Sequence, residues 1–598
     1  MVGYLHAITL QTPAPPQQLQ PGIPAALDAL LMRMLEKEAS QRPTASEVAQ
    51  ALLAAESNRH SSDNEPAEAQ TMMLQQTTAA APEATAPGSA QQTTPDKPKP
   101  RKRWVAALLS LLVLVGGFFG YRSFAPNSKQ IESIAVMPFV NESGNADVEY
   151  LSDGMTETLI SSLSQLPNLS VKGRSSVFRY KGKDLDTKTL SKELGVQAVL
   201  YGRVIQRGDQ LTLGLELLDA VTENVIWSGK YDRKQADVVS LQSEIARDVS
   251  NKLKTKLSGA EVAKVEKGYT ANPEAYRLYL QGRFYWNKRS EPNLKKSIEY
   301  FDQAIALDPA YALAYAGLAD AYGVLPSNTD DSRPDETYPK ARAAAQKALE
   351  INPNMAEPHA TLGYVLHEYD WKHAEAEKEF KRAIEIDPNY PSAHQWYGEY
   401  LMNMGRSDEA IAELKRALEL DPLSPVLNVV LGNLYFNSNR VDDAIAQYQK
   451  TIEIDPAFAS AHNNLSNAYF LKGMYEEGIE EQRKRLLLLG RPPEQVEKNS
   501  AELKEAYRRS GARGYWQKVL ENATENARAT NGKIDPLNLA YFQLGMGNQE
   551  DALETLEKAV SSGPHYTKLV MLKTSPQWAP LRAEPRFKEL LRKVGLPE

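Results

Sequence analysis

The spacing of hydrophobic residues divides the chain into segments of four kinds. From residue 272 onward, apolar residues recur every three or four positions, which is the period of an amphipathic helix. Between residues 130 and 257, apolar runs and alternating stretches are interleaved with helical spacing. Residues 104–121 contain no charged side chain, and residues 57–103 contain almost no aromatic one. The pattern predicts a multidomain chain that is mainly α, with one small α/β domain.

The segment 130–257 has the pattern of alternating strands and helices. An apolar run over residues 133–139 predicts a first strand, and helical spacing follows over residues 148–166. We expect a second strand over 169–178, a short helix over 187–194 that ends at Gly195, and a closing helix over 236–255. Residues 196–233 predict three strands joined by turns at 207–209 and 221–224.

The C-terminal half repeats itself. Proline follows Asp or Asn at Pro309, Pro353, Pro388, Pro422 and Pro456, at intervals of 44, 35, 34 and 34 residues. The long interval contains an insertion near residues 324–338. Small residues recur where two helices of a unit must approach each other, as at Ala410 and Ala417. We expect repeats over 272–490, of which five are clear, and a degenerate stretch with a late unit and a C-terminal cap over 491–598.

A period of 34 residues is that of a tetratricopeptide (TPR) repeat. The unit from Pro391 to Pro422 resembles this family in its Tyr397, Gly398, Gly405, Ala410, Leu414 and Ala417. The resemblance implies a TPR α-solenoid, in which helix pairs stack into a superhelix. Its concave face, lined by the first helix of each pair, would hold a protein or peptide.

Polar side chains on the expected first helices are the candidate partner-binding residues. Amides both donate and accept hydrogen bonds, so they can hold a peptide backbone without reading its sequence. The candidates are Asn433, Asn437, Asn463, Asn464, Asn467, Gln395, Glu399 and Tyr364. The asparagines resemble the ladders of some TPR grooves. The alternative is that they satisfy helix ends or water.

Residues 104–121 have the length and the flanks of a membrane span. As a helix, these 18 residues cover about 27 Å, close to the hydrocarbon thickness of a bilayer. Trp104 and Tyr121 stand at the ends, and basic residues crowd the N-terminal side. We expect a single-pass inner-membrane protein with a helix over 104–124 and a disordered juxtamembrane linker over 57–103. The charge bias predicts a cytoplasmic N-terminus, with the later domains periplasmic or extracellular. The alternative is a buried core helix.

The first 56 residues resemble the last two helices of a eukaryotic-like serine/threonine protein kinase. The resemblance rests on Leu-Leu-x-Arg-Met-Leu-x-Lys at residues 30–37 and on Arg-Pro-Thr-Ala-x-Glu-Val at residues 42–48. The glycine-rich loop, strand lysine and two aspartates that kinases require for phosphotransfer are absent. The glutamate that pairs in this family with the arginine matching Arg42 is absent too. We expect a truncated kinase tail over 1–56, either a shortened gene model or a remnant, and no phosphotransfer by this sequence.

Three motifs in the α/β segment resemble a small TolB-like domain, which often precedes TPR arrays in bacterial signalling proteins. They are Val-Met-Pro-Phe at 136–139, Leu-Ser-Asp-Gly-Met-Thr-Glu at 151–157 and Val-Leu-Tyr-Gly-Arg-Val at 199–204. The resemblance implies no catalytic role. Asp153 and Glu157 lie one helical turn apart, as a metal or acid–base pair would, but a solvated helix face is the preferred interpretation. Gly154 and Gly202 are interpreted as positions of close backbone packing.

Composition excludes several kinds of chemistry. The chain has no cysteine, so disulfides, thiolate zinc sites and cysteine nucleophiles are excluded. A net charge of −7 gives no reason to expect nucleic acid as a partner. His359, His394 and His462 fall at one repeat position, a periodicity that favours helix packing over metal binding. We expect no catalytic residue, no metal and no cofactor.

These features predict a membrane-anchored interaction scaffold, the sensor or adaptor part of a serine/threonine kinase signalling protein. One alternative is a fragment of an active receptor-like kinase, ATP-dependent, whose catalytic region is missing from the sequence. Another is a structural assembly factor of the cell envelope. The ligand, the oligomeric state and the role of the TolB-like domain stay open.

Overall fold

The computed structural model describes residues 25–34, 43, 47–48, 131–145, 148–166, 169–183, 185–253, 270–328, 334–530, 532–563 and 569–597. The chain divides into two compact units, Met1–Arg122 and Ser123–Glu598, which we describe separately. In the first unit, α3 (Ala25–Met34) lies within the segment that resembles the last two helices of a kinase, and Leu30 is buried. The predicted linker and membrane segment, and most of the predicted kinase tail, lie outside the described residues. Among the described residues, no helix has the length and apolarity needed to cross a membrane.

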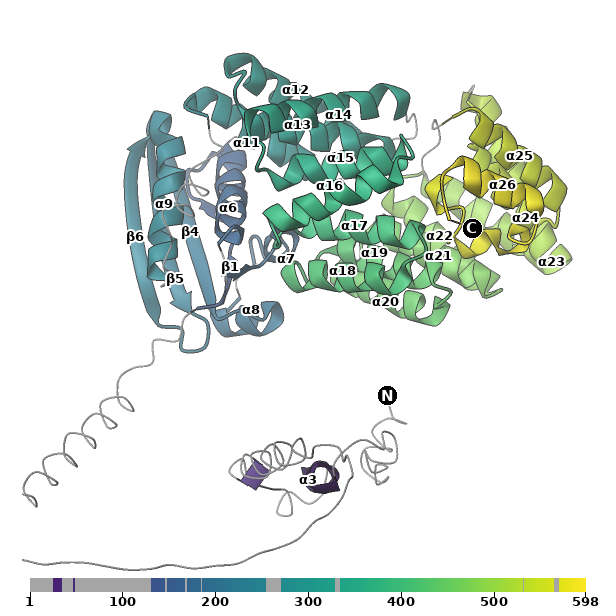
Figure 1. Ribbon diagram of the computed structural model, residues 1–598, viewed down its shortest axis with the longest axis horizontal. Coiled ribbons are helices and arrows are strands. Elements are labelled where there is room, and N and C mark those ends of the chain that lie inside the picture. The colour runs from purple at the N-terminus through teal and green to yellow at the C-terminus, as the bar shows by residue number, and fades with distance from the viewer. Residues whose placement is uncertain are drawn as a thin grey trace, which may run out of the picture. The chain divides into compact units, whose positions relative to one another are not determined.

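A mixed sheet forms the core of the N-terminal part of the second unit (Figure 1). Its strands are β1 (Ser133–Val136), β2 (Val140–Asn141), β3 (Ser170–Val171), β4 (Ala198–Arg207), β5 (Gln210–Asp219) and β6 (Val225–Lys234). The order is β3-β1-β4-β5-β6, and β2 also pairs with β4. β1 runs parallel to β3 and β4, whereas β4, β5 and β6 are antiparallel neighbours. The three long strands are those expected within residues 196–233.

Two helices cover one face of this sheet. The helical elements of the domain are α6 (Glu149–Ser164), α7 (Arg174–Phe178), α8 (Thr187–Leu194), the 3-10 turn η3 (Gln235–Asp237) and α9 (Val238–Lys252). α6 contacts β1 and β3, and α9 contacts β6 and α6. β5 contributes Leu211, Leu213, Leu215 and Leu217 to the buried side, so every second residue of the strand enters the core.

The prediction of a second strand over 169–178 is wrong for most of its length. Only Ser170–Val171 pairs as a strand, and the chain then enters the short helix α7. The N-cap of α7 is Gly173, which offers no side chain to cap the helix. The missing cap comes from a distant part of the chain, as described below, so the local sequence does not show this helix. α8 matches its prediction, and Gly195 closes it with φ of 65°.

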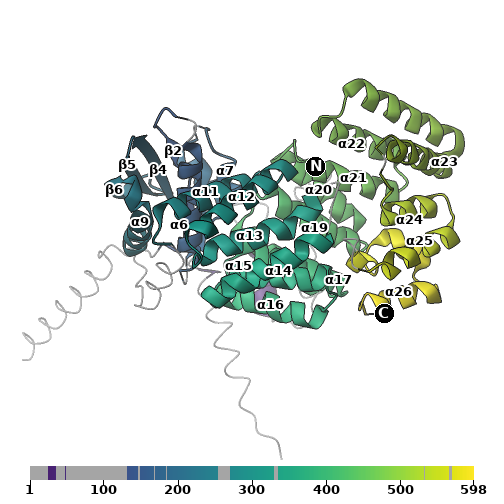
Figure 2. The same ribbon diagram turned by 90° about the horizontal axis from the view of Figure 1, so that it is seen from above.

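Helix pairs follow along the chain (Figure 2). They are α11 (Pro273–Trp286) with α12 (Glu291–Leu307), α13 (Ala312–Val324) with α14 (Pro334–Ile351), α15 (Ala356–Glu368) with α16 (His373–Ile386), α17 (Pro391–Asn403) with α18 (Ser407–Leu420), α19 (Pro425–Asn437) with α20 (Val441–Ile454), and α21 (Ala459–Leu471) with α22 (Tyr475–Leu488). The insertion holds a short 3-10 turn, η4 (Leu325–Asn328). The five expected repeats and the unit that starts at Ala459 therefore each form a helix pair.

A small residue on each first helix allows the second helix of the same pair to pack closely against it. A Cβ added to Gly363 would lie 2.8 Å from Phe380 Cδ1 on the second helix of that pair. The second helices contribute alanines such as Ala376 and Ala410, which are fully buried. Between the two helices of the fourth pair, Gly405 adopts φ of 83°, which permits the sharp turn. Sterically small positions thus recur where the expected repeat requires them.

The end of the chain forms a second apolar cluster. α23 (Pro493–Thr530) is two helices joined by a kink at Ser510 and Gly511. The elements that follow are α24 (Pro536–Gly545), α25 (Gln549–Ser561), η5 (Leu569–Met571), η6 (Pro576–Leu581) and α26 (Pro585–Lys593). We call residues 536–597 the C-terminal cap. Trp371 and Met404, from the turns inside the third and fourth pairs, pack against its core. The cap therefore folds back onto earlier repeats.

Candidate protein-interaction site

Four of the eight candidate residues fall at one register position of the first helices. Tyr364, Glu399, Asn433 and Asn467 each directly follow the small residue that faces the second helix, which is Gly363, Gly398, Gly432 or Ser466. Because repeats stack with a regular rotation, these side chains form a column along one surface. We call this surface, formed by the first helices, the inner face. All four side chains are partly exposed.

The fold already satisfies part of the predicted asparagine ladder. Asn433 Oδ1 accepts hydrogen bonds from the Tyr448 hydroxyl at 2.8 Å and from Asn464 Nδ2 at 2.8 Å. Asn463 Nδ2 donates to Asn464 Oδ1 at 3.2 Å, and Asn463 Oδ1 accepts from Gln482 Nε2 at 3.3 Å. These three asparagines therefore position one another and the second helices.

The other two asparagines differ in their availability. Asn437 Oδ1 accepts from the Ser575 hydroxyl at 3.4 Å, so the C-terminal cap reaches the end of this first helix. Asn467 has no hydrogen-bond partner in the part of the chain that the structure describes. Its amide has both its donor and its acceptor left for a ligand.

Glu399 is an acid without a cation. Gln395 Nε2 donates to Glu399 Oε1 at 3.4 Å, and no ion pair involves Glu399 among the described residues. The surrounding helices remove bulk solvent, and this burial raises the pKa of Glu399 to about 7. The ring of Tyr364 contacts that of Trp396 on the next first helix in a tilted arrangement, with centroids 5.2 Å apart and an interplanar angle of 37°. The middle of the inner face therefore offers an aromatic surface beside a carboxyl group that is half protonated near neutral pH.

Glu357 on α15 is a second acid with a raised pKa, and it is not among the eight candidate residues. Burial raises its pKa to about 7, and the charges of Asp387 and Asp320 add to the effect. It precedes Tyr364 by seven residues, about two helical turns, and so lies on the same side of α15. Its spacing of seven residues from Tyr364, which places both on one side of the helix, is the signal that could have identified it.

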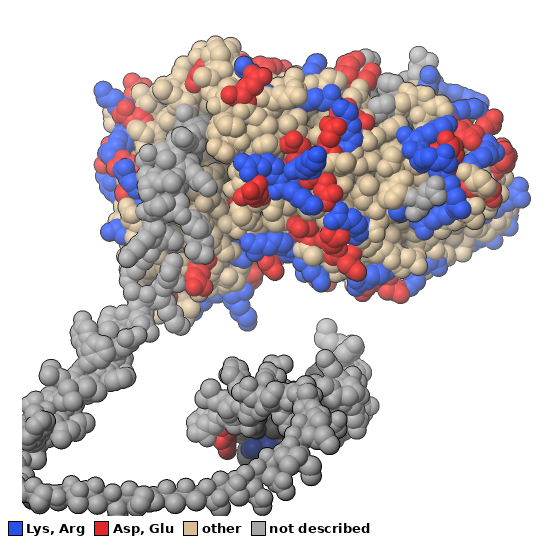
Figure 3. Space-filling model, in the orientation of Figure 1, with Lys and Arg blue, Asp and Glu red and all other residues tan. Residues whose placement is uncertain are grey.

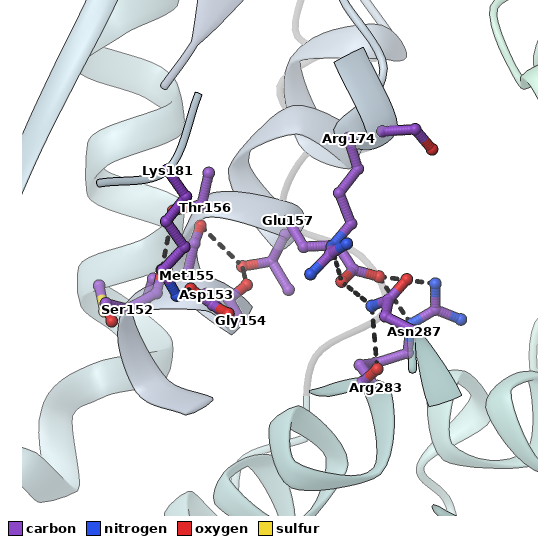
Figure 4. A network of polar contacts seen from close by, with 12 residues as sticks. Ser152, Asp153, Gly154, Met155, Thr156, Glu157, Arg174, Lys181, Arg283 and Asn287 are labelled. Carbon is purple, nitrogen blue, oxygen red and sulfur yellow. Dashed lines mark hydrogen bonds and ion pairs between the residues drawn. The ribbon is translucent and has the colours of Figure 1, made fainter. Parts of the chain in front are cut away.

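The α/β domain is joined to the first repeat through a polar network on α6 (Figure 4). Glu157 pairs with Arg283 of α11 at 2.6 Å and with Arg174 at 3.2 Å, and Asn287 Nδ2 donates to it at 2.6 Å. Burial alone would raise the pKa of Glu157, but the charges of Arg283 and Arg174 outweigh it and lower the pKa. Arg283 reaches onward to Asp320 of α13 at 3.5 Å. The network thus connects the α/β domain to two first helices.

Asp153 and Glu157 are neither a metal pair nor a solvated face. Asp153 pairs with Lys181 inside the α/β domain, while Glu157 faces α11. No cluster of three or more metal-binding side chains occurs among the described residues. Gly154, between the two acids, is the contact point with α11: a Cβ there would lie 2.8 Å from Leu280 Cδ2. The motif at 151–157 is therefore a docking motif for the first repeat.

A second contact between the two parts is made by Asp421. Its Oδ1 accepts from Ser176 N at 2.7 Å, its Oδ2 accepts from Ser175 N at 3.3 Å, and the Ser176 hydroxyl also donates to it. Gly173 N donates to Leu420 O at 2.8 Å. A Cβ on Gly173 would lie 2.7 Å from Asp421 Oδ2, so only glycine fits there. Asp421 therefore caps α7 from the repeats, as an N-cap side chain would do locally.

The three periodic histidines connect the helices of their own pairs. His359, His394 and His462 each place Nδ1 at 2.6 Å from a glutamate of the second helix. The rings of His394 and His462 also place Nε2 within 3.0 Å and 3.2 Å of a proline carbonyl. Their periodicity therefore reflects packing between helices.

The surface of the repeats carries charges of both signs. On the face shown in Figure 3, Lys and Arg are interspersed with Asp and Glu. A shallow depression lies elsewhere, on the open side of the sheet, lined by residues that include Tyr201, Arg203 and Glu216. Neither feature combines a nucleophile with a base or a set of metal ligands.

Several of the helix pairs match family models of known repeats. A model described as tetratricopeptide repeat matches residues 372–430, and one described as TPR repeat matches residues 432–473. The chain carries tetratricopeptide repeats. In the α/β domain before these TPR repeats, residues 129–248 match the second domain of HilA/YgeH-like transcriptional regulators. The resemblances to a TolB-like domain and to a kinase tail stay predictions.

One curated relative and two solved structures illustrate the extent of similarity. The putative adenylate cyclase 3 of Rhizobium meliloti (strain 1021) is 32% identical over 237 residues, which are 39% of this chain and 40% of the relative. A thermophilic TPR protein of Thermus thermophilus is 20% identical, with a TM-score of 0.29, over 33% of this chain and 99% of that one. YrrB, a TPR protein with an unusual peptide-binding site, is 23% identical with a TM-score of 0.23, over 34% and 97%.

Proposed function

We propose that this chain is an interaction scaffold whose TPR inner face binds an extended segment of another protein. The observation that carries the proposal is the column Tyr364, Glu399, Asn433 and Asn467, which presents an aromatic ring, an acid and amides at the same register. Glu399 lacks a cation and Asn467 lacks a hydrogen-bond partner among the described residues. An extended peptide supplies both, because its backbone and its basic side chains complement these groups.

The scaffold would be the sensor or adaptor part of a membrane-anchored serine/threonine kinase signalling protein. The apolar run at 104–121 supports the anchor, with the later domains outside the cytoplasm, and the motif at 42–48 supports the kinase. The relative of Rhizobium meliloti is named as a putative cyclase, and this chain spans less than half of its length. That name is in keeping with a scaffold that accompanies a signalling enzyme. The α6–α11 contact offers a route by which occupancy of the repeats reaches the α/β domain.

The test is capture of partners by the full-length chain, followed by mass spectrometry. We compare the wild type with Glu399→Gln/Asn467→Ala, which changes the inner face without touching the internal bonds of Asn433. The control is Lys450→Ala/Glu453→Gln, two exposed positions on the second helix α20. The proposal expects a protein that wild type and control retain and the inner-face variant loses. Equal capture by all three would refute the inner face as the binding site.

The enzymatic alternative is a fragment of an active receptor-like kinase. The motif at 42–48 favours it, whereas the missing phosphate-binding and catalytic motifs oppose phosphotransfer by this sequence. We therefore expect no autophosphorylation when the purified chain is incubated with ATP and magnesium. Incorporation of phosphate would favour the kinase over the interaction scaffold.

A further inference from the structure

Two buried histidines lie where the C-terminal cap meets the repeats. His367 lies in the last turn of α15 and His373 begins α16, and their Nδ1 atoms are 2.9 Å apart. His373 Nε2 lies 2.8 Å from Val594 O in the cap. His367 Nε2 lies 3.0 Å from Asn403 Nδ2. The two rings are 2% and 6% exposed, so these contacts replace water.

The partners fix where the protons of both rings lie. Val594 O only accepts, so His373 Nε2 must be the donor and its Nδ1 the acceptor. His367 Nδ1 must then donate to His373 Nδ1. This leaves His367 Nε2 as the acceptor for the Asn403 amide. With the Asn403 amide in this orientation, the chain of three hydrogen bonds is complete only when both imidazoles are neutral. A proton added to His373 Nδ1 would face the N–H of His367 at hydrogen-bond distance.

In the part of the chain that the structure describes, the hydrogen-bond partners of the four ring nitrogens are Val594 O, the Asn403 amide and the other ring, none of which carries a negative charge. Tyr400 of α17 meets His367 edge-on, with ring centroids 5.1 Å apart, and its hydroxyl donates to Glu377 of α16 at 3.5 Å. Glu377 is itself paired with Lys381 and Arg406.

The other charged residues around the pair are directed elsewhere or add positive charge. Glu368 follows His367 in sequence, and its charge acts on the hydroxyl groups of Tyr338 and Tyr364. Lys372 precedes His373, and its Nζ lies 3.9 Å from Glu375 Oε2. Lys593 precedes Val594 in the cap and is exposed. Burial lowers the pKa of His367 well below its usual value, and the neighbouring His373 lowers it further. Burial also lowers the pKa of His373, against the opposing effect of its bond to Val594.

The same contact region holds the cap against several repeats. Trp371, between the two histidines in sequence, packs against the core of the cap together with Met404. Gly595 fits close to His373, because a Cβ there would lie 3.2 Å from His373 Cδ2. The Ser575 hydroxyl donates to Asn437, one of the inner-face amides. Release of the cap would therefore uncover Asn437 for a ligand.

We propose that His367 and His373 form a proton-operated latch, which holds the C-terminal cap on the repeats while both rings are neutral and releases it when His373 takes up a proton. The docked cap binds fewer protons than the released one. Docking is therefore complete above the ordinary histidine pKa of about 6.5 and weakens as pH falls below it. Each unit by which docking lowers the pKa corresponds to a tenfold change in the docking equilibrium.

The chain lacks cysteine, so spin labels can be placed at two chosen sites of the full-length protein. We choose Lys378→Cys on α16 and Ala583→Cys in the cap, both exposed. Electron–electron distance measurements should give one short distance at pH 8 and a broad, longer distribution at pH 5. A distribution that is the same at both pH values would overturn the latch.

Two variants separate titration from packing. His373→Gln keeps an N–H for Val594 O but does not titrate, so it should hold the short distance at pH 5. His359→Gln, a histidine paired with Glu379 away from the cap, should release as the wild type does. Release of His373→Gln at pH 5 but not at pH 8 would contradict the proposal.

If the cap of His373→Gln is already released at pH 8, the test is made on the wild-type protein instead. Exchange of the histidine C2 hydrogen, followed by mass spectrometry, gives the pKa of each ring. The midpoint of cap release must coincide with protonation of His373, and a midpoint set by another group overturns the latch.

Discussion

At the scale of single residues, the inner face holds acids that are destabilising when they ionise. Glu399 has a pKa of about 7, whereas an unfolded chain ionises a glutamate near pH 4.5. The folded protein therefore binds more protons than the unfolded one between these values, and stability falls as pH rises through them. A partner that brings a cation to Glu399 would remove this penalty, which fits a binding surface better than a structural one.

The substitution Glu399→Gln tests this assignment. It should raise the free energy of unfolding at pH 8 by about 1–2 kcal/mol, after allowance for the solvent contact of the side chain. At pH 4.5 it should change little, because the wild-type acid is then neutral. Thermal unfolding at the two pH values measures the difference. Glu453→Gln, an exposed acid on α20, should show no such dependence, and an equal response of both variants would contradict the assignment.

At the scale of elements, the α6–α11 contact determines how the α/β domain attaches to the repeats. Gly154 permits close approach of the two helices, since its missing Cβ would lie 2.8 Å from Leu280 Cδ2 and 3.0 Å from Leu280 Cβ. Gly154→Ala should force the helices apart and destabilise the contact by about 1–3 kcal/mol. Gly323→Ala on α13 meets Thr361 Cγ2 at an ordinary 3.5 Å and should be neutral or slightly stabilising.

Hydrogen exchange of α6 and α11 reads out this prediction directly. Gly154→Ala should accelerate exchange in both helices, and Gly323→Ala in neither. Unchanged protection of α11 in Gly154→Ala would mean that the contact does not depend on close backbone approach.

The same elements show how far the sequence predicts the structure. Periodic spacing predicts the helix pairs, because each repeat buries the same small positions against its partner helix. It does not predict α7, which begins at Arg174. The residue that caps this helix, Asp421, follows 247 residues later and belongs to the repeats. Nor does periodic spacing identify the partner of Glu157, since Arg283 lies in the first repeat. Contacts within a repeat are local and visible in the sequence, whereas contacts between domains are not.

At the scale of the whole second unit, the α/β domain and the repeats share one continuous apolar core. That core extends from Ile134 in β1 to Leu434 in α19. The α/β domain contacts both the first repeat, through Glu157, and the loop after the fourth, through Asp421. These contacts lie more than one hundred residues apart along the array, so the domain braces the repeats against relative movement.

Asp421→Ala should loosen this brace without unfolding the repeats. It removes the acceptors for Ser175 and Ser176 at the start of α7, and loss of a helix cap costs about 1–2 kcal/mol. We expect faster hydrogen exchange in α7 and β3, with the first repeat still protected by Glu157. Asp455→Ala is the matched control: Asp455 stands at the same repeat position, but among the described residues its carboxylate accepts a hydrogen bond from the nearby Ala457 N alone, at 3.0 Å. Faster exchange in Asp455→Ala should remain within the loop around Asp455.

If the amides of α7 exchange as slowly in Asp421→Ala as in the wild type, Asp421 does not couple the fourth repeat to the α/β domain. The α6–α11 contact alone would then restrict the movement of the repeats.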